Sequence, residues 1–504
     1  MTGKTTTAAP NLRQGLQQAL RSLLIYKGIW EEPVLQSFRS LVVKLGPIGK
    51  AGSQGLAEES DTPTPGEQLA IEYYAFLSEL LEGSTGIRPG NGVGVGSFWQ
   101  EHLLGVILDH TSPVIQVLCQ RAQETAEASV HRLHIQVLEH DLALLSRLFW
   151  AFDDGLDELI REAMGDISLP ADGILNALYG RLVEGESWRC ESKLTPDHVL
   201  QHQGKRSKPL LAEAILESEA LYLRRQFYAT RKWADMAPTL VDYHRRFGTG
   251  QFARCAAFLW SSTPGEGLIG VDVTDPIQLE ELSGYGEQVQ KVTENTGRFL
   301  KGLPAHNLLL YGDRGTGKSS TVKGLIHRFV AQGLRLVEVG REELSGLGEL
   351  VKSLSRSSLK FIVFIDDLSF EESETEFKAL KSVLEGSVVR QPENVRIYAT
   401  SNRRHLIKEN FSDTNAGGEV RLQDTVQEKL SLSDRFGLTI IYPSPDQKTY
   451  LSIVEHLAAM EGLCIGKEEL KARALQWTLW HNERSGRTAR QFMDELKAEL
   501  QIQG

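Results

Sequence analysis

The chain has 504 residues, which is too long for one hydrophobic core and predicts two or three domains. Its 41% hydrophobic and 24% charged residues are typical of a globular protein and exclude disordered and fibrous classes. The formal net charge of −11 excludes a globally basic surface for nucleic acid or anionic lipid, but not a local basic patch.

The four cysteines are scattered and include no C-x-x-C pair; they are Cys119, Cys190, Cys255 and Cys464. This pattern argues against a zinc site or a disulfide framework and fits a reducing compartment. The N-terminus has no apolar stretch of signal-peptide length, and no run elsewhere is long enough to span a bilayer. We therefore expect a cytoplasmic protein without a membrane partner.

The first half of the chain is predicted to be an almost entirely helical domain, residues 1–265. From Asn11 to about Trp260, apolar residues recur at three- and four-residue spacing. Gly46 to Gly66 lacks this periodicity and predicts a loop. The glycine-rich run from Gly90 to Ser97 has no strand before it, so we interpret it as a connection between helices rather than a phosphate loop. This half contains no catalytic constellation and is expected to act as an adaptor.

Two patterns in the helical half admit a functional interpretation. His131 and His134 share a helix face, with His140 farther along, but no carboxylate or cysteine completes a metal site, so ordinary histidines are favoured. The predicted helix from Lys208 to Met236 mixes basic with aromatic side chains and could bind nucleic acid. We favour a buried aromatic stripe with a solvated basic flank. The side chains concerned are Arg224, Arg225, Arg231, Lys232, Tyr222, Phe227, Tyr228 and Trp233.

After residue 265 short apolar runs alternate with helical patterns. We predict a five-stranded parallel sheet covered by helices, with ligands at the carboxyl ends of the strands. The predicted strands are 308–311, 334–339, 361–365, 395–400 and 438–442.

The first of these strands leads directly into a phosphate-binding loop of the form G-x-x-x-x-G-K-[ST], followed by a helix. The glycines let backbone N–H groups surround phosphate oxygens, Lys318 supplies a positive charge, and the Ser319 hydroxyl can bind Mg²⁺. The start of the helix adds a positive dipole end. We expect nucleotide contacts from Gly312, Asp313, Arg314, Gly315, Thr316, Gly317, Lys318, Ser319 and Ser320.

Polar side chains follow the later strands. Asp366 and Asp367 end the strand at 361–365, where Asp366 is expected to join Ser319 at Mg²⁺ and Asp367 to polarise the attacking water. Asn402 ends the next strand and would stand beside the γ-phosphate. An arginine, Arg435, comes just before the last strand, and the C-terminal helices carry Arg487 and Arg490.

In this order the motifs resemble those of the AAA+ ATPases, over about residues 266–504. The resemblance implies ATP and Mg²⁺ as ligands, an α/β nucleotide domain at 266–443 and a helical lid at 444–504. It implies Asn402 as sensor 1, Arg435 as a finger that completes a neighbour's site, and Arg487 as sensor 2, with Arg490 as the competing choice. DDLSFEE and TSNRRHL look most like an uncharacterised bacterial group of predicted ATP-binding proteins.

One position departs from the common AAA+ pattern. Many members have Asp-Glu where this chain has Asp366-Asp367, and the shorter side chain reaches less far toward a water. Initiators and helicase loaders of the superfamily share the Asp-Asp pair. We therefore expect a homo-oligomeric ATPase that remodels or loads an unknown macromolecule, either protein or nucleic acid. A nucleic-acid loader and an ATP-dependent switch with negligible turnover are the alternatives.

Overall fold

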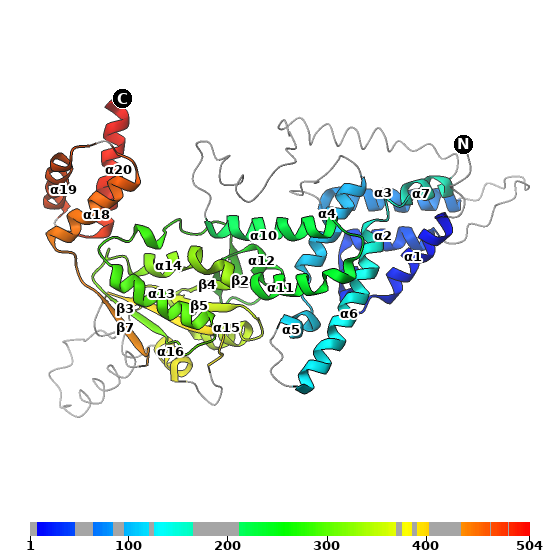
Figure 1. Ribbon diagram of the computed structural model, residues 1–504, viewed down its shortest axis with the longest axis horizontal. Helices are drawn as coiled ribbons and strands as arrows, with labels where there is room; N and C mark the ends of the chain where they lie inside the picture. The colour runs from blue at the N-terminus through cyan, green and yellow to red at the C-terminus, as the bar shows by residue number, and fades with distance from the viewer. Residues whose placement is uncertain are drawn as a thin grey trace, which may run out of the picture. The chain divides into compact units, whose positions relative to one another are not determined.

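The computed structural model describes residues 8–45, 64–83, 95–119, 125–164, 211–368, 375–385, 391–402, 435–463, 465–481 and 483–503 (Figure 1). The chain divides into two compact units, Met1–Ser207 with Ser218–His244, and Lys208–Glu217 with Arg245–Gly504. The predicted loop at Gly46–Gly66 and the glycine-rich run at Gly90–Ser97 lie mostly outside the described residues, as do Cys190 and Cys464.

The described part of the first unit is helical. An aromatic cluster forms its core, in which Phe38 stacks on Trp99 with ring centroids 3.9 Å apart and Phe76 packs against both rings. The Trp99 indole N–H donates to the Leu148 carbonyl at 2.7 Å, so burying this ring leaves no orphaned donor. The helices are α1 (Ala8–Ser22), η1 (Tyr26–Glu31), α2 (Pro33–Lys44), α3 (Pro65–Gly83), α4 (Val95–Asp109), α5 (Pro113–Cys119), α6 (Thr125–Phe149), α7 (Leu156–Met164) and η2 (Trp233–Met236).

Two helices belong partly to each unit, α10 (Leu211–Tyr228) and α11 (Ala237–Phe247). The helix predicted from Lys208 to Met236 is thus shorter than expected and is followed by the separate turn η2. Within the described ranges no single helix is long and apolar enough to cross a bilayer. The pair Gly96–Asp109 and Pro113–Cys119 passes that test only jointly, across a 67° bend.

The second unit is built on a sheet of seven strands rather than the predicted five, in the order β2-β1-β4-β5-β6-β3-β7. All neighbours are parallel except β1 and β2, which pair antiparallel. The strands are β1 (Ala257–Ser261), β2 (Gly267–Val271), β3 (Leu308–Gly312), β4 (Leu334–Val339), β5 (Lys360–Ile365), β6 (Val395–Ser401) and β7 (Leu438–Tyr442).

The five predicted strands are present, and the two additional strands lie at one edge. The five-stranded prediction was wrong because β1 lies at the end of the stretch that was interpreted as helical, and the short apolar run of β2 is interrupted by Gly270 and partly exposed. Their paired residues Leu259 and Ile269 are 47% and 44% exposed. The predicted domain boundary at residue 265 falls in the turn between them, so the sheet begins before it.

Helices and short turns complete the second unit. They are α12 (Gln251–Arg254), η3 (Leu279–Glu281), α13 (Gly286–Leu300), α14 (Lys318–Phe329), η4 (Val330–Gln332), η5 (Arg341–Gly346), α15 (Leu347–Leu354) and α16 (Thr375–Glu385). The C-terminal helices α18 (Gln447–Met460), α19 (Lys467–His481) and α20 (Gly486–Gln503) pack on one another and are called the lid below (Figure 1).

A buried arginine joins β4 to the residues that precede the sheet. Arg335 on β4 is 0% exposed. Its guanidinium donates to the carbonyls of Phe247 at 2.7 Å, Phe252 at 2.8 Å and Leu334 at 2.8 Å. A buried charge is tolerated when its donors are satisfied, and here they hold the segment that leads into β1.

Candidate functional site

The loop between β3 and α14 wraps around its own lysine. Lys318 Nζ donates to the carbonyls of Gly312 at 2.7 Å and Asp313 at 2.6 Å, and the residue is 5% exposed. Burial lowers the pKa of Lys318, while the carboxylates of Asp313, Asp366 and Asp367 oppose that shift. Because an ammonium bonds more strongly to an anion than to a neutral carbonyl, a phosphate could replace these two acceptors.

Two glycines of this loop stand where no side chain fits. A Cβ at Gly312 would collide with the carbonyl of Tyr442, its partner on β7. Gly315 has φ of +73°, and a Cβ there would lie 2.7 Å from Ser485 Oγ. The glycine spacing of the motif is therefore fixed by a strand on one side and the lid on the other.

The Asp366 carboxylate lies beside the first turn of α14. Its Oδ1 accepts hydrogen bonds from Ser319 Oγ at 2.6 Å and from Thr400 Oγ1 at 2.5 Å. The strand order β5-β6-β3 brings the three residues together, since their strands end at one edge of the sheet. Hydroxyl and carboxylate oxygens are ligands that Mg²⁺ accepts, so Ser319 and Asp366 fit the predicted cation.

Asp367 is held by the neighbouring strand. Its Oδ1 accepts a hydrogen bond from Asn402 Nδ2 at 2.6 Å, and its Oδ2 lies 4.0 Å from the guanidinium of Arg314. Its backbone has φ of +51°, and its N–H donates to Thr400 Oγ1 at 2.9 Å. The two predicted polar positions Asp367 and Asn402 are thus in direct contact.

The lid touches the phosphate loop through the start of α20. Gly486 N donates to the carbonyl of Gly315 at 2.9 Å, and the preceding Ser485 hydroxyl accepts from Thr488 N at 3.1 Å, which caps the helix. Arg487 follows at once. This contact carries the positive end of α20 and one arginine to the loop that is expected to bind phosphate.

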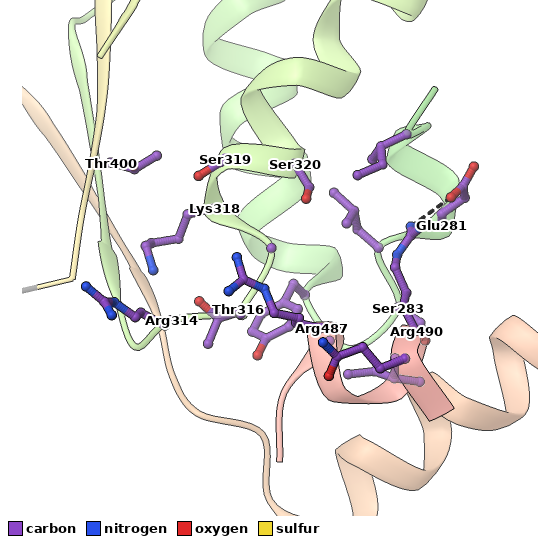
Figure 2. A pocket seen from close by; sticks show the side chains of 18 of the residues that line it. Glu281, Ser283, Arg314, Thr316, Lys318, Ser319, Ser320, Thr400, Arg487 and Arg490 are labelled. Carbon is purple, nitrogen blue, oxygen red and sulfur yellow. Dashed lines mark hydrogen bonds and ion pairs between the residues drawn. The ribbon is translucent and has the colours of Figure 1, made fainter. Parts of the chain in front are cut away.

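The two candidate lid arginines point in different directions. Arg490 forms an ion pair with Glu281 at 2.8 Å, drawn as a dashed line in Figure 2. Arg487 instead points toward the start of α14, near Lys318 and Ser319 (Figure 2). The geometry therefore favours Arg487 over Arg490 as the arginine that could reach a phosphate.

These groups surround one cavity of 540 Å³, which is large enough for a nucleotide. Its polar end is formed by the loop, the acidic pair, Asn402 and Arg487. The segment before α13 and the lid add apolar side chains to the lining, together with the ion pair of Arg490 and Glu281; the apolar ones are Ile277, Leu282, Tyr285, Ile453 and Leu457. A lining that combines charged groups with apolar side chains suits a ligand that has both phosphates and a base.

One predicted site residue lies elsewhere. Arg435 does not line this cavity. It precedes β7 and is half-buried, next to Phe436, which is 0% exposed and belongs to the core of the sheet. This placement leaves the predicted role of Arg435 in a neighbouring subunit's site as a prediction.

The sequence did not point to Thr400 or to Glu281. Thr400 stands inside an apolar strand, where threonine is common, and only the pairing of β6 with β5 brings its hydroxyl to the acidic pair. Its place at the strand end, two residues before Asn402, is a signal that could have found it. Glu281 is one of several acidic residues in its segment, so no sequence signal separates it from the others.

The basic and aromatic side chains of α10 and the turn after it are mostly engaged inside the first unit. Phe227 and Trp233 are fully buried, as the favoured interpretation required. Arg224 bonds Glu101 at 2.6 Å, and Arg231 bonds Asp154 at 2.6 Å. Tyr222, with 59% exposure, does not belong to the buried stripe. No group of three or more His, Cys, Asp or Glu within the described ranges could hold a metal ion, and this includes the histidines of α6.

Comparison with known proteins finds a family match and several distant structural likenesses. Residues 253–500 match the family model described as "Protein of unknown function (DUF815)". No curated protein matches the chain. Among solved structures, the Thermotoga maritima RuvB Holliday junction branch migration motor and two of its point variants are distantly similar. Sequence identities are 15 or 16% and TM-scores 0.27 or 0.28, over 44% of this chain and 72% of each of those. Over residues 253–500, just under half of the chain, the sequence is therefore similar to the DUF815 family, a group of predicted AAA+ ATP-binding proteins.

Proposed function

We propose that the protein binds ATP with Mg²⁺ in the cavity between the sheet and the lid and hydrolyses it at an oligomer interface. The movement that results would let the helical half remodel or load a macromolecular target. The observation that carries this proposal is the convergence on one cavity of the phosphate loop, both carboxylates, Asn402 and Arg487.

In this proposal the binding energy comes mainly from the phosphate end. Lys318 would exchange its two carbonyl acceptors for phosphate oxygens, and the N-terminus of α14 would add its dipole. Ser319 and Asp366 would hold Mg²⁺, which neutralises charge on the phosphate oxygens when bound. Arg487 would approach from the lid, so that binding draws the lid toward the loop.

The hydrolytic step would rest on Asp367 and Asn402. A water between them and the γ-phosphate would donate a hydrogen bond to the Asp367 carboxylate, which orients the water oxygen toward phosphorus. Asn402 already contacts that carboxylate at 2.6 Å and would hold the water on its other side. The remaining positive charge would come from Arg435 of a neighbouring subunit, as in other enzymes that receive an arginine in trans.

A nucleotide-dependent switch with negligible turnover is the second candidate. It is favoured by the short Asp367 side chain, whose carboxylate is bonded to Asn402 and faces Arg314. The two functions differ in the number of phosphate equivalents that each site releases. An ATPase releases many equivalents per site, whereas a switch stops at or below one.

The loader alternative gains less support. The Asp366-Asp367 pair is shared with loaders, but Arg224 and Arg231, which suggested nucleic-acid binding, are paired with acidic residues. Paired arginines offer little free positive charge to a phosphate backbone. Salt-dependent binding of single-stranded DNA by the full chain would restore this alternative.

Replacement of Lys318 by Ala tests nucleotide binding. The variant loses two bonds from a charged donor, each worth about 1.5–3 kcal/mol, so ATP affinity should fall by about 100-fold or more. Titration calorimetry measures the affinity. Lys323→Ala is the matched control, because Lys323 lies on the same helix and pairs with Glu338 at 3.5 Å, away from the cavity. Equal ATP affinity in both variants would overturn the proposed function.

A further inference from the structure

We propose that Thr400 is a positioning residue whose single hydroxyl holds both members of the acidic pair, Asp366 by its carboxylate and Asp367 by its backbone amide. The proposal rests on the proposed function, because it concerns how this chain prepares its own residues for Mg²⁺ and water. Thr400 Oγ1 donates to Asp366 Oδ1 at 2.5 Å and accepts from Asp367 N at 2.9 Å. A hydroxyl has one hydrogen and two lone pairs, so the two bonds use its hydrogen and one of its acceptor positions.

The backbone around Thr400 reinforces this arrangement. The Thr400 carbonyl accepts from Leu368 N at 2.7 Å, and the Ser401 hydroxyl donates to the Leu368 carbonyl at 2.9 Å. The end of β6 therefore fixes the chain on both sides of Asp367, the residue with φ of +51°. A left-handed conformation at a non-glycine residue persists when its surroundings determine it. Thr400 supplies the shorter of two bonds to the Asp367 amide, at 2.9 Å, and Asp366 Oδ1 accepts the other at 3.1 Å.

Thr400 and Ser319 both donate to Asp366, but they differ in what can replace them. Ser319 lines the cavity at the start of α14, and its oxygen is the expected Mg²⁺ ligand, so its bond to Asp366 can be exchanged for a cation. Thr400 also lines the cavity, but it is only 1% exposed and is branched at Cβ, which restricts its rotamer. Its bond to Asp366 can therefore persist while Ser319 changes partner, and it keeps the carboxylate oriented.

Thr400→Val tests the proposal, since valine keeps the shape and removes both hydrogen bonds. In the nucleotide-free protein, amide hydrogen exchange at residues 366–368 should become faster. This measurement requires neither a bound metal nor ATP hydrolysis. Loss of a group that orients a metal ligand typically costs 10–100-fold in metal affinity, so the Mg²⁺ concentration for half-maximal enhancement of ATP binding should rise by about that factor. ATP affinity in EDTA should stay unchanged, because the phosphate loop is intact.

Two further variants distinguish the effect of losing the hydroxyl from the effect of substituting a residue in a strand. Thr400→Ser keeps the hydroxyl and should retain the protection and the Mg²⁺ response. Thr439→Val makes the same substitution at an exposed position of β7 and should leave both unchanged. If valine at 400 prevents folding, Thr400→Cys, with its weak S–H donor, replaces it and should shift both readouts in the same direction.

Failure of the role proposed for Thr400 can be distinguished from failure of the proposed function. If the unmodified protein binds no ATP, the proposed function fails. If it binds ATP with Mg²⁺ and Thr400→Val shows unchanged exchange and Mg²⁺ response, the role of Thr400 is wrong while the function stands. Equal defects in the serine and valine variants would assign the effect to packing of β6 and would also overturn the proposal.

Discussion

At the scale of single residues, the backbone of Asp367 explains an unusual choice of side chain. Among the described residues it is the one non-glycine residue with positive φ. Aspartate and asparagine are enriched several-fold in that region because a short polar side chain bonds locally, whereas longer side chains are not. The aspartate where many AAA+ proteins have glutamate therefore fits a left-handed turn that Thr400 and Asn402 hold in place.

Introducing the glutamate that many AAA+ proteins have should therefore not raise the proposed turnover. We expect Asp367→Glu to lose about 1 kcal/mol of folding free energy from backbone strain and to show no faster turnover. Asp367→Asn tolerates the same backbone, so its stability should match the unmodified protein while phosphate release falls. Urea unfolding and a phosphate-release assay measure the two effects. A glutamate variant that is equally stable and hydrolyses ATP faster would show that the turn does not restrict this position.

At the scale of elements, Arg335 links β4 to the residues that precede the sheet. Three of its hydrogen bonds run to the carbonyls of Phe247, Phe252 and Leu334 within a fully buried site. Bonds to a charged donor are worth about 1.5–3 kcal/mol each, and a buried acceptor that loses its donor keeps its desolvation cost. This side chain therefore fixes the entry into β1.

Arg335→Met should destabilise the second unit by about 3 kcal/mol or more, because methionine fills the volume but leaves buried carbonyls without their donors. Thermal and urea unfolding of the full chain measure the loss. Arg356→Met is the control, since Arg356 lies in an exposed turn after α15. Similar stabilities of the two variants would contradict the role given to the buried guanidinium.

The sequence predicted those elements whose pattern is local. β5 is a continuous apolar run that ends in two carboxylates, so both the strand and its polar end were readable. β1 and β2 were not, because their burial depends on pairing with β4 and with each other. Dependence on tertiary contacts also limits how much of the site can be predicted from the sequence. Lys318, Ser319 and Asp366 belong to recognisable motifs, whereas Thr400 and Glu281 gain their contacts only from strand order and from the lid.

At the scale of the whole molecule, the position of β1 changes which fragment should be stable. A fragment that begins at residue 266 lacks β1 and two of the acceptors of Arg335. It also loses Phe258 and Trp260 from the core of the sheet. A fragment of residues 245–504 keeps all of these groups and all the proposed ligand contacts.

We expect the 245–504 fragment to fold and to bind ATP, and the 266–504 fragment to unfold or aggregate, because its sheet has an uncovered edge and unpaired buried groups. Circular dichroism with ATP calorimetry distinguishes them. If the shorter fragment folds and binds ATP with the affinity of the longer one, β1 is dispensable and the boundary predicted at residue 265 is adequate.

The proposed assembly can be tested at Arg435. Its neighbour Phe436 is buried in the core, and a Cβ on Gly437, with φ of +60°, would lie 2.8 Å from His306 Nδ1. The backbone that carries Arg435 is thus anchored, although the residue does not line the cavity of its own chain. An arginine in this position suits delivery to the site of a second copy.

Arg435→Ala should therefore bind ATP within a few-fold of the unmodified affinity and hydrolyse it about 10³-fold more slowly, since an arginine supplied in trans acts mainly on the transition state. Mixing Arg435→Ala with Lys318→Ala subunits should restore part of the activity, because some interfaces then combine an intact phosphate loop with an intact arginine. Arg356→Ala serves as the surface control and should match the unmodified rate. If Arg435→Ala hydrolyses ATP at the unmodified rate and the protein stays monomeric with ATP, no arginine is delivered between subunits. Hydrolysis would then have to be completed by Lys318, Arg314 and Arg487 of the same chain.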